Sequence, residues 1–208
     1  GVANDHSIAW GISKKLSDEG AELCFTYQGE SLHRRVKPLA NSIKSNFLIE
    51  CDVLKEGSIK KSFDEIGNHW GEIDFVLHSI AFSEKEELKG KYLNTSRNNF
   101  SNTMLISCFS FTEVAHEAEK LMKNGGSLLT LTYDGSQKYI RNYNVMGVAK
   151  AALESSVRYL AADLGPSNIR VNALSAGPMK TLAMAGISGG KDMMKWSEKN
   201  SLMNRNID

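Results

Sequence analysis

The chain has 208 residues, of which 41% are hydrophobic and 24% are charged, and its formal net charge at pH 7 is +1. This size suits one globular domain with a sizeable core, and the charge lacks the basic surplus of a general nucleic-acid binder. No apolar run is long enough to span a bilayer, and no signal-peptide pattern precedes the first expected helix. We therefore expect a cytoplasmic protein with no membrane or nucleic-acid partner, whose three cysteines are free thiols.

Apolar segments that predict strands alternate along the chain with amphipathic segments that predict helices. The strand-like runs are 21–27, 45–53, 73–82, 126–133 and 168–177, and the helical segments are 7–19, 54–70, 100–122 and 144–164. The strand-like runs have few polar positions, which is typical of parallel strands covered on both faces. Repeated βα units of this length predict an α/β fold, a doubly wound, Rossmann-like parallel sheet, in a single domain over residues 1–208.

The segment "GVANDHSIAWG", residues 1–11, opens the first expected helix. Gly1, a short polar loop and Ser7 near a helix N-terminus would present backbone N–H groups and a hydroxyl to an anion. The tight GxGxxG spacing is absent, however, and Ser7 is explained equally well as a plain N-cap.

Ligands of doubly wound sheets bind beyond the carboxyl ends of the strands. Gln28 follows the first strand-like run, where NAD-binding folds often place an acid and NADP-binding folds an arginine. A neutral glutamine fits an unphosphorylated ribose and favours NAD, while Arg34 and Arg35 leave NADP open. Asp52 either caps the next helix or meets an adenine amino group beside Val53.

A tyrosine and a lysine stand seven residues apart in "NYNVMGVAK", residues 142–150. Seven steps of 100° bring two helical positions within about 20° of each other and roughly 10 Å apart along the axis. Tyr143 and Lys150 would therefore project from one face, where a phenol and an ammonium could act on one ligand. Taken separately, they are more often a half-buried aromatic and a solvated lysine.

Several segments in order, among them "GVANDHSIAWGI", "DFVLHSIAF", "YNVMGVAK" and "RVNALSAGPMKTLA", carry a family resemblance. Together they resemble the NADH-dependent enoyl-[acyl-carrier-protein] reductases of bacterial type II fatty-acid synthesis, a divergent branch of the short-chain dehydrogenase/reductase superfamily. The most specific motif is Tyr-x-x-Met-x-x-x-Lys, found here as Tyr143, Met146 and Lys150. The resemblance covers essentially the whole chain and implies an enoyl thioester on acyl carrier protein as substrate, and a homotetramer.

The resemblance also implies a role for each matching position. From the pyrophosphate turn through adenosine and ribose to the nicotinamide end, the cofactor residues are Gly1, Ser7, Ile8, Gln28, Asp52, Val53, Ile80, Lys150, Met179, Lys180, Thr181, Leu182 and Ala183. NADH is the expected cofactor and NADPH the less expected one. Tyr143 is the proton-donating or enolate-stabilising tyrosine, Tyr133 is a second active-site tyrosine, and Ser83 lies where the substrate approaches.

The methionine-rich segment 181–200 is expected to form a substrate-binding loop that includes Met184 and Ile187. Methionine adapts to irregular apolar shapes, as an acyl chain would require, and core packing is the alternative. No histidine spacing fits a metal site, and His78 is expected to be a strand-end residue with a satisfied hydrogen bond.

The chemistry of the implied substrate suggests a role for Tyr143 and a role for Lys150. A 2-enoyl thioester is electron-poor at C3, so hydride addition there develops negative charge on the thioester oxygen. We expect the Tyr143 hydroxyl to stabilise that charge. Lys150 is expected to keep a positive charge nearby that favours the tyrosinate form of a neighbouring phenol.

The chain also departs from the family pattern. Ala81 stands where many members have glycine, which narrows the pocket by one methyl group. The family's first and last strands are absent from the sequence given, and because the first strand is central, we expect a gap in the middle of the sheet.

Two other functions fit the sequence less well. An ordinary short-chain dehydrogenase predicts Tyr-x-x-x-Lys and a catalytic serine on the fifth strand, whereas Tyr133 occupies that region here. A non-catalytic dinucleotide-binding module has no need of Tyr143, Lys150 and Tyr133 together.

Overall fold

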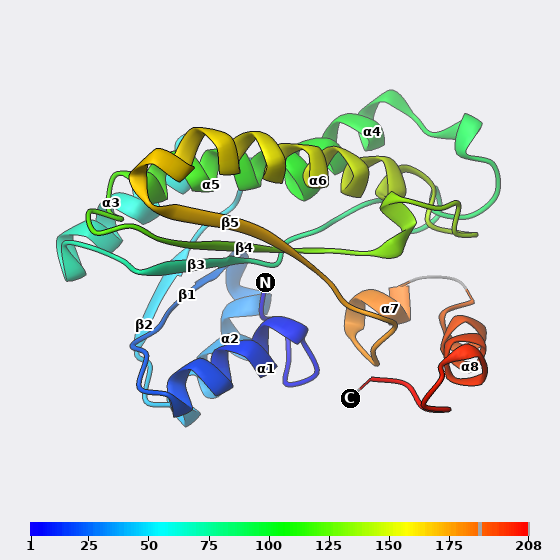
Figure 1. Ribbon diagram of the computed structural model, residues 1–208, viewed down its shortest axis with the longest axis horizontal. Helices are drawn as coiled ribbons and strands as arrows, with labels where there is room; N and C mark the ends of the chain where they lie inside the picture. The colour runs from blue at the N-terminus through cyan, green and yellow to red at the C-terminus, as the bar shows by residue number, and fades with distance from the viewer. Residues whose placement is uncertain (187–188, 208) are drawn as a thin grey trace.

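The computed structural model describes residues 1–186 and 189–207 and shows parallel strands between two layers of helices (Figure 1). The strands are β1 (Cys24–Tyr27), β2 (Phe47–Glu50), β3 (Phe75–His78), β4 (Gly126–Thr132) and β5 (Ile169–Ser175). The helices are α1 (Ile8–Asp18), α2 (Gly29–Ser42), α3 (Ser58–Trp70), α4 (Arg97–Met104), α5 (Ser110–Glu119), α6 (Asn144–Leu164), α7 (Leu182–Gly186) and α8 (Gly190–Asn200). Short turns are η1 (Tyr92–Asn94), the π-helical η2 (Leu105–Phe109), η3 (Asp134–Ser136) and η4 (Gly165–Ser167). The α/β prediction is confirmed.

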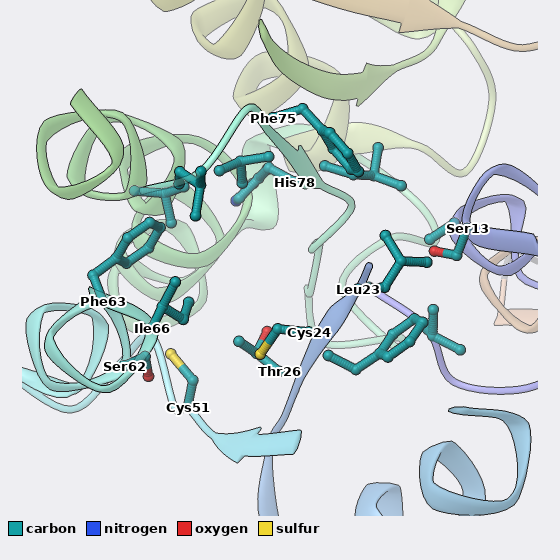
Figure 2. A pocket seen from close by; sticks show the side chains of 18 of the residues that line it. Ser13, Leu23, Cys24, Thr26, Cys51, Ser62, Phe63, Ile66, Phe75 and His78 are labelled. Atoms are coloured by element: carbon teal, nitrogen blue, oxygen red, sulfur yellow. The ribbon is translucent and has the colours of Figure 1, made fainter. Parts of the chain in front are cut away.

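The sheet is divided into two pieces. One piece pairs β1 with β2, and the other has the order β3-β4-β5, with every pairing parallel. Between β1 and β3 lies a cavity of about 410 Å³, lined by side chains from both strands and from α1 and α3 (Figure 2). The gap expected in the middle of the sheet is therefore present.

Two apolar cores lie on opposite faces of the strands. The first joins α3, α5 and α6 to β4 and β5, with Phe111, Leu128 and Leu153 fully buried. The second joins α1 and α2 to β1, with Val36 at its centre. The α6 prediction is confirmed over its whole length, whereas α2 was not among the helical segments expected from the sequence. Across the described residues, no helix is long and apolar enough to cross a bilayer.

His78, at the end of β3, ties three elements together. Its ring nitrogens lie 3.0 Å from Thr130 Oγ1 on β4 and 2.8 Å from Ser110 Oγ on α5. Burial, followed by the charge of Lys150, lowers the pKa of His78 to about 3. The satisfied strand-end histidine expected from the sequence is present.

This buried histidine predicts an acid-sensitive stability. The unfolded chain binds a proton at His78 with a pKa near 6.5, whereas the folded protein keeps the ring neutral down to about pH 3. Stability is therefore lost as the pH falls through that window, by about 1.4 kcal/mol per pH unit. Urea unfolding at two pH values between 5 and 6.5 should show a shallower dependence in His78→Gln than in the wild type. The exposed His116→Gln should keep the wild-type slope, and equal slopes in all three proteins would contradict the prediction.

Candidate active site

Two tyrosines meet beyond the carboxyl end of β4. Tyr133 follows the last residue of that strand, and Tyr143 is the residue before the first turn of α6. Their rings make an edge-to-face contact with centroids 5.3 Å apart. Tyr143 is buried, and Gly135 packs so closely on its ring that an added Cβ would lie 2.5 Å from Tyr143 Cδ1. The loop between β4 and α6 therefore holds the ring of Tyr143 in place.

The ionisation of Tyr143 differs from the sequence-based expectation. Burial, reinforced by the neighbouring Tyr133, raises the pKa of Tyr143 well above its ordinary value. The expectation that the charge of Lys150 would favour a tyrosinate here is wrong, because loss of solvation dominates the pKa of Tyr143. A protonated phenol is the better hydrogen-bond donor, so Tyr143 can serve a developing oxyanion.

Lys150 lies on α6, two turns after Tyr143, and is also buried. Its Nζ donates a hydrogen bond to the backbone oxygen of Leu131 on β4, at 2.7 Å. Burial lowers the pKa of Lys150 to about 8, with Cys108 and Glu154 acting in the opposite direction. The alternative of a solvated lysine does not hold, because this ammonium is buried and held at the strand end.

At the start of the chain, the backbone of Gly1 lies against Ser79, which follows β3. Gly1 is close to Ser79: a Cβ on Gly1 would lie 2.6 Å from Ser79 Cβ and 2.8 Å from Ser79 O. Ser7 precedes α1 in the N-cap position, but its hydroxyl makes no capping bond to that helix. It accepts hydrogen bonds from the backbone N–H of Ala3 at 3.0 Å and of Asn4 at 3.2 Å. Ser7 therefore shapes the turn before α1, and its hydroxyl does not cap the N-terminus of that helix.

The other expected cofactor residues follow the strands in a row. Gly1, Val53 and Ile80 lie at the edge of the same cavity that separates β1 from β3, whereas Gln28 is exposed after β1. Asp52 does not cap a helix, because α3 begins six residues later. Its Oδ1 accepts from the backbone N–H of Leu54 at 3.1 Å, which forms a turn. The residues present thus fit a dinucleotide laid along the carboxyl ends of the strands.

The segment after β5 lies beyond the carboxyl end of the last described strand. The expected residues there are Met179, Lys180, Thr181, Leu182 and Ala183. Thr181 Oγ1 accepts from the backbone N–H of Met184 at 3.1 Å, at the start of α7. The segment expected as a loop over 181–200 contains α7 and α8, and Ile187 lies outside the described residues.

Asn99 and Met193 contact expected substrate residues. Met193 belongs to the segment 181–200 expected to bind substrate, whereas Asn99 was not predicted from the sequence. Ser83 Oγ donates to Asn99 Oδ1 at 3.2 Å, and Asn99 is buried on α4. The hydroxyl of Tyr133 lies 3.0 Å from Met193 Sδ on α8. A methionine of the 181–200 segment therefore covers the second tyrosine. Asn99 carries no motif that would have revealed it.

Comparison with known proteins gives consistent matches. The family described as "Enoyl-(Acyl carrier protein) reductase" matches residues 1–208. The chain is 61% identical to an enoyl-[acyl-carrier-protein] reductase [NADH] of Rhizobium meliloti, over 100% of this chain and 77% of that protein. The solved reductase of Anaplasma phagocytophilum, in complex with NAD, has a TM-score of 0.95 at 52% identity, covering 99% of this chain and 79% of that one. That of Bacillus cereus, with NADP+ and indole naphthyridinone, has a TM-score of 0.96 at 46% identity, covering 99% and 80%.

Proposed function

Because the chain belongs to the enoyl-(acyl carrier protein) reductase family, we infer that it reduces the double bond of 2-enoyl thioesters on acyl carrier protein, with NADH as the electron donor. It is an oxidoreductase of fatty-acid synthesis. The observation that supports this reaction best is the protonated, buried Tyr143 beside Tyr133 at the end of β4.

The side chains of this site suit the charge that the reaction creates. Bound NADH supplies the hydride that C3 of the substrate receives. Tyr143 donates a hydrogen bond to the thioester oxygen, on which negative charge grows toward the transition state. Its raised pKa keeps the proton on the phenol until it is needed. Tyr133 packs against the Tyr143 ring and lines the same side of the site. A proton from the Tyr143 phenol or from solvent, delivered to C2, completes the saturated product.

The row of strand ends is assigned to the cofactor. Gly1, Ser7 and Ile8 would hold its pyrophosphate at the N-terminus of α1. Gln28, Asp52 and Val53 would hold the adenosine end, Ile80 would lie beside the nicotinamide ribose, and Lys150 would hydrogen-bond that ribose. The last group is the segment after β5: Met179, Lys180, Thr181, Leu182 and Ala183.

The substrate is assigned to the side of the site formed by Ser83, Tyr133 and the segment 181–200. Met193 contacts the Tyr133 hydroxyl, and Met184 lies on α7 in the same segment, which suits an apolar acyl chain. Ile187 keeps the same assignment on the family resemblance alone.

We also propose a homotetramer that works in the cytoplasm. Large apolar side chains stand exposed on α4, η2 and α6, with exposed fractions of 38% for Phe100, 49% for Phe109 and 74% for Tyr159. Such a surface is typical of an interface between subunits. The three free thiols suit a reducing compartment.

An absorbance assay of NADH consumption tests the function. Oxidation that depends on crotonyl or longer enoyl thioesters is the expected result, with NADPH and ketone substrates run in parallel. Turnover of ketones alone would indicate an ordinary short-chain dehydrogenase instead. Tight NADH binding without turnover of either substrate would indicate a non-catalytic binding module.

A further inference from the structure

Glu154 lies on α6, one turn after Lys150, and makes three side-chain hydrogen bonds to a single loop. Its Oε1 accepts from Thr132 Oγ1 at 2.6 Å and from Ser136 Oγ, and its Oε2 accepts from Gln137 Nε2. Thr132 is the last residue of β4, while Ser136 and Gln137 lie beyond Tyr133. One carboxylate thus binds loop residues on both sides of Tyr133.

The loop that Glu154 holds also contacts Tyr143. Gly135, the neighbour of Ser136, packs on the Tyr143 ring, and a Cβ on Gly147 of α6 would lie 2.8 Å from the Gly135 oxygen. The loop is therefore clamped between the first turn of α6, the Tyr143 ring and the Glu154 carboxylate. If Ser136 were displaced, its neighbour Gly135 would move as well and would change its contact with the Tyr143 ring.

The charge state of Glu154 suits this contact. Burial would raise its pKa, but the hydrogen bonds from Ser136, Thr132 and Gln137 and the charge of Arg158 hold that pKa below its ordinary value. A carboxylate accepts hydrogen bonds only, and the three side chains that face it are all able to donate. Hydrogen bonds to a charged acceptor are roughly twice as strong as neutral ones.

We propose that Glu154 is a positioning residue for the reductase reaction: through the loop 132–137 it holds Tyr133 and Tyr143 in the orientation that meets the substrate oxygen. This inference rests on the proposed function of the two tyrosines. Glu154 touches neither substrate nor cofactor in this scheme. Its charge also raises the pKa of Lys150, so NADH binding is measured beside kcat to separate that effect from the positioning of the tyrosines. Small displacements of a reacting group are costly, because a misplacement of about 1 Å can lower a rate about 10²-fold.

The first test is kinetic. Glu154→Ala is expected to lower kcat about 10- to 100-fold and to leave NADH binding, measured by fluorescence, within about 2-fold. Glu154→Gln keeps one oxygen that can accept from Thr132 and Ser136, so most of the rate should return. Asp163→Asn removes an exposed carboxylate near the end of the same helix and should leave the rate unchanged. Equal rates for Glu154→Ala and the wild type would overturn the inference.

The second test is a double-mutant cycle with Tyr143→Phe. If Glu154 acts through the Tyr143 hydroxyl, Glu154→Ala should change the residual rate of Tyr143→Phe by less than about 2-fold. A full, additive loss in that background would show that Glu154 does not act through the Tyr143 hydroxyl and would overturn that part of the inference. Should Glu154→Ala fail to fold, Ser136→Ala removes one of the three donors, and an unchanged kcat in that variant would overturn the inference as well.

A third measurement needs no turnover and separates this inference from the proposed function. The near-ultraviolet circular dichroism of the packed tyrosine pair should weaken in Glu154→Ala and persist in Glu154→Gln and Asp163→Asn. An inactive wild type that shows this pattern would refute the reductase function but keep the clamp. An active wild type with the same tyrosine signal in every variant would refute the clamp but keep the function.

Discussion

Replacing Tyr143 with phenylalanine is expected to lower kcat for enoyl-thioester reduction about 10²- to 10³-fold, the usual cost of losing one oxyanion donor. The ring of Tyr143 is buried and packed against Tyr133 and Gly135, and phenylalanine keeps all of that packing. The change therefore removes the hydroxyl alone. Steady-state kinetics should show the loss in kcat, with the KM for NADH nearly unchanged, because the phenol serves charge that exists mainly in the transition state.

A matched control exists a few residues earlier in the chain. Tyr139 is 83% exposed, so Tyr139→Phe removes a phenol hydroxyl without touching the packed pair and should turn over normally. Near-normal kcat in Tyr143→Phe would contradict the assignment of this hydroxyl to the substrate oxygen. A loss confined to KM would assign Tyr143 to binding.

Replacing Lys150 with methionine is expected to have two opposite effects. NADH affinity and kcat should fall together, by about 10²-fold in kcat/KM, because a charged donor assigned to the cofactor is lost. The folded protein should become more stable. Burial lowers the pKa of Lys150 from 10.5 to about 8, so the charged form opposes folding by on the order of 3 kcal/mol at pH 7. Methionine has a similar length and carries no charge to bury, and the lost hydrogen bond to the Leu131 oxygen, worth about 1–2 kcal/mol, offsets only part of the gain.

The pH dependence of the wild type provides the check on Lys150. A base whose pKa is lowered by folding destabilises the fold while it is charged, and that penalty disappears as the pH rises from about 8 to 10.5. NADH affinity should fall over the same rise, because the ammonium is lost. Lys150→Met should show neither change, and calorimetry and fluorescence titration measure the two separately. A less stable Lys150→Met at pH 7 would contradict the account of this buried charge.

The sequence predicted α6 over its full length and all five described strands, because those segments carry strong local patterns. It did not predict α2, whose polar composition and internal Pro38 weaken any helical signal. The π-helical turn η2 between α4 and α5 was also missed, because packing and not local composition decides such a turn.

The site likewise has features that local sequence patterns predict and features that they do not. Tyr143 and Lys150 were proposed for the site because their spacing is local, along one helix, and matches the family motif. The role of Glu154 depends on a loop that folds back onto α6, with partners 17 to 22 residues earlier in the chain. The ionisation of Tyr143 was predicted with the wrong sign, because its direction depends on how deeply the ring is buried. Neither burial nor long-range contact can be read from residue spacing.

The assigned dinucleotide reaches across both apolar cores of the fold. Its adenosine end is assigned to residues after β1 and β2, and its nicotinamide end to residues near β4 and α6. Phe75 and Leu77 of β3 pack against the core around α1 and α2, while β3 itself pairs with β4. How firmly those two side chains pack therefore affects how accurately the nicotinamide is aimed at the substrate.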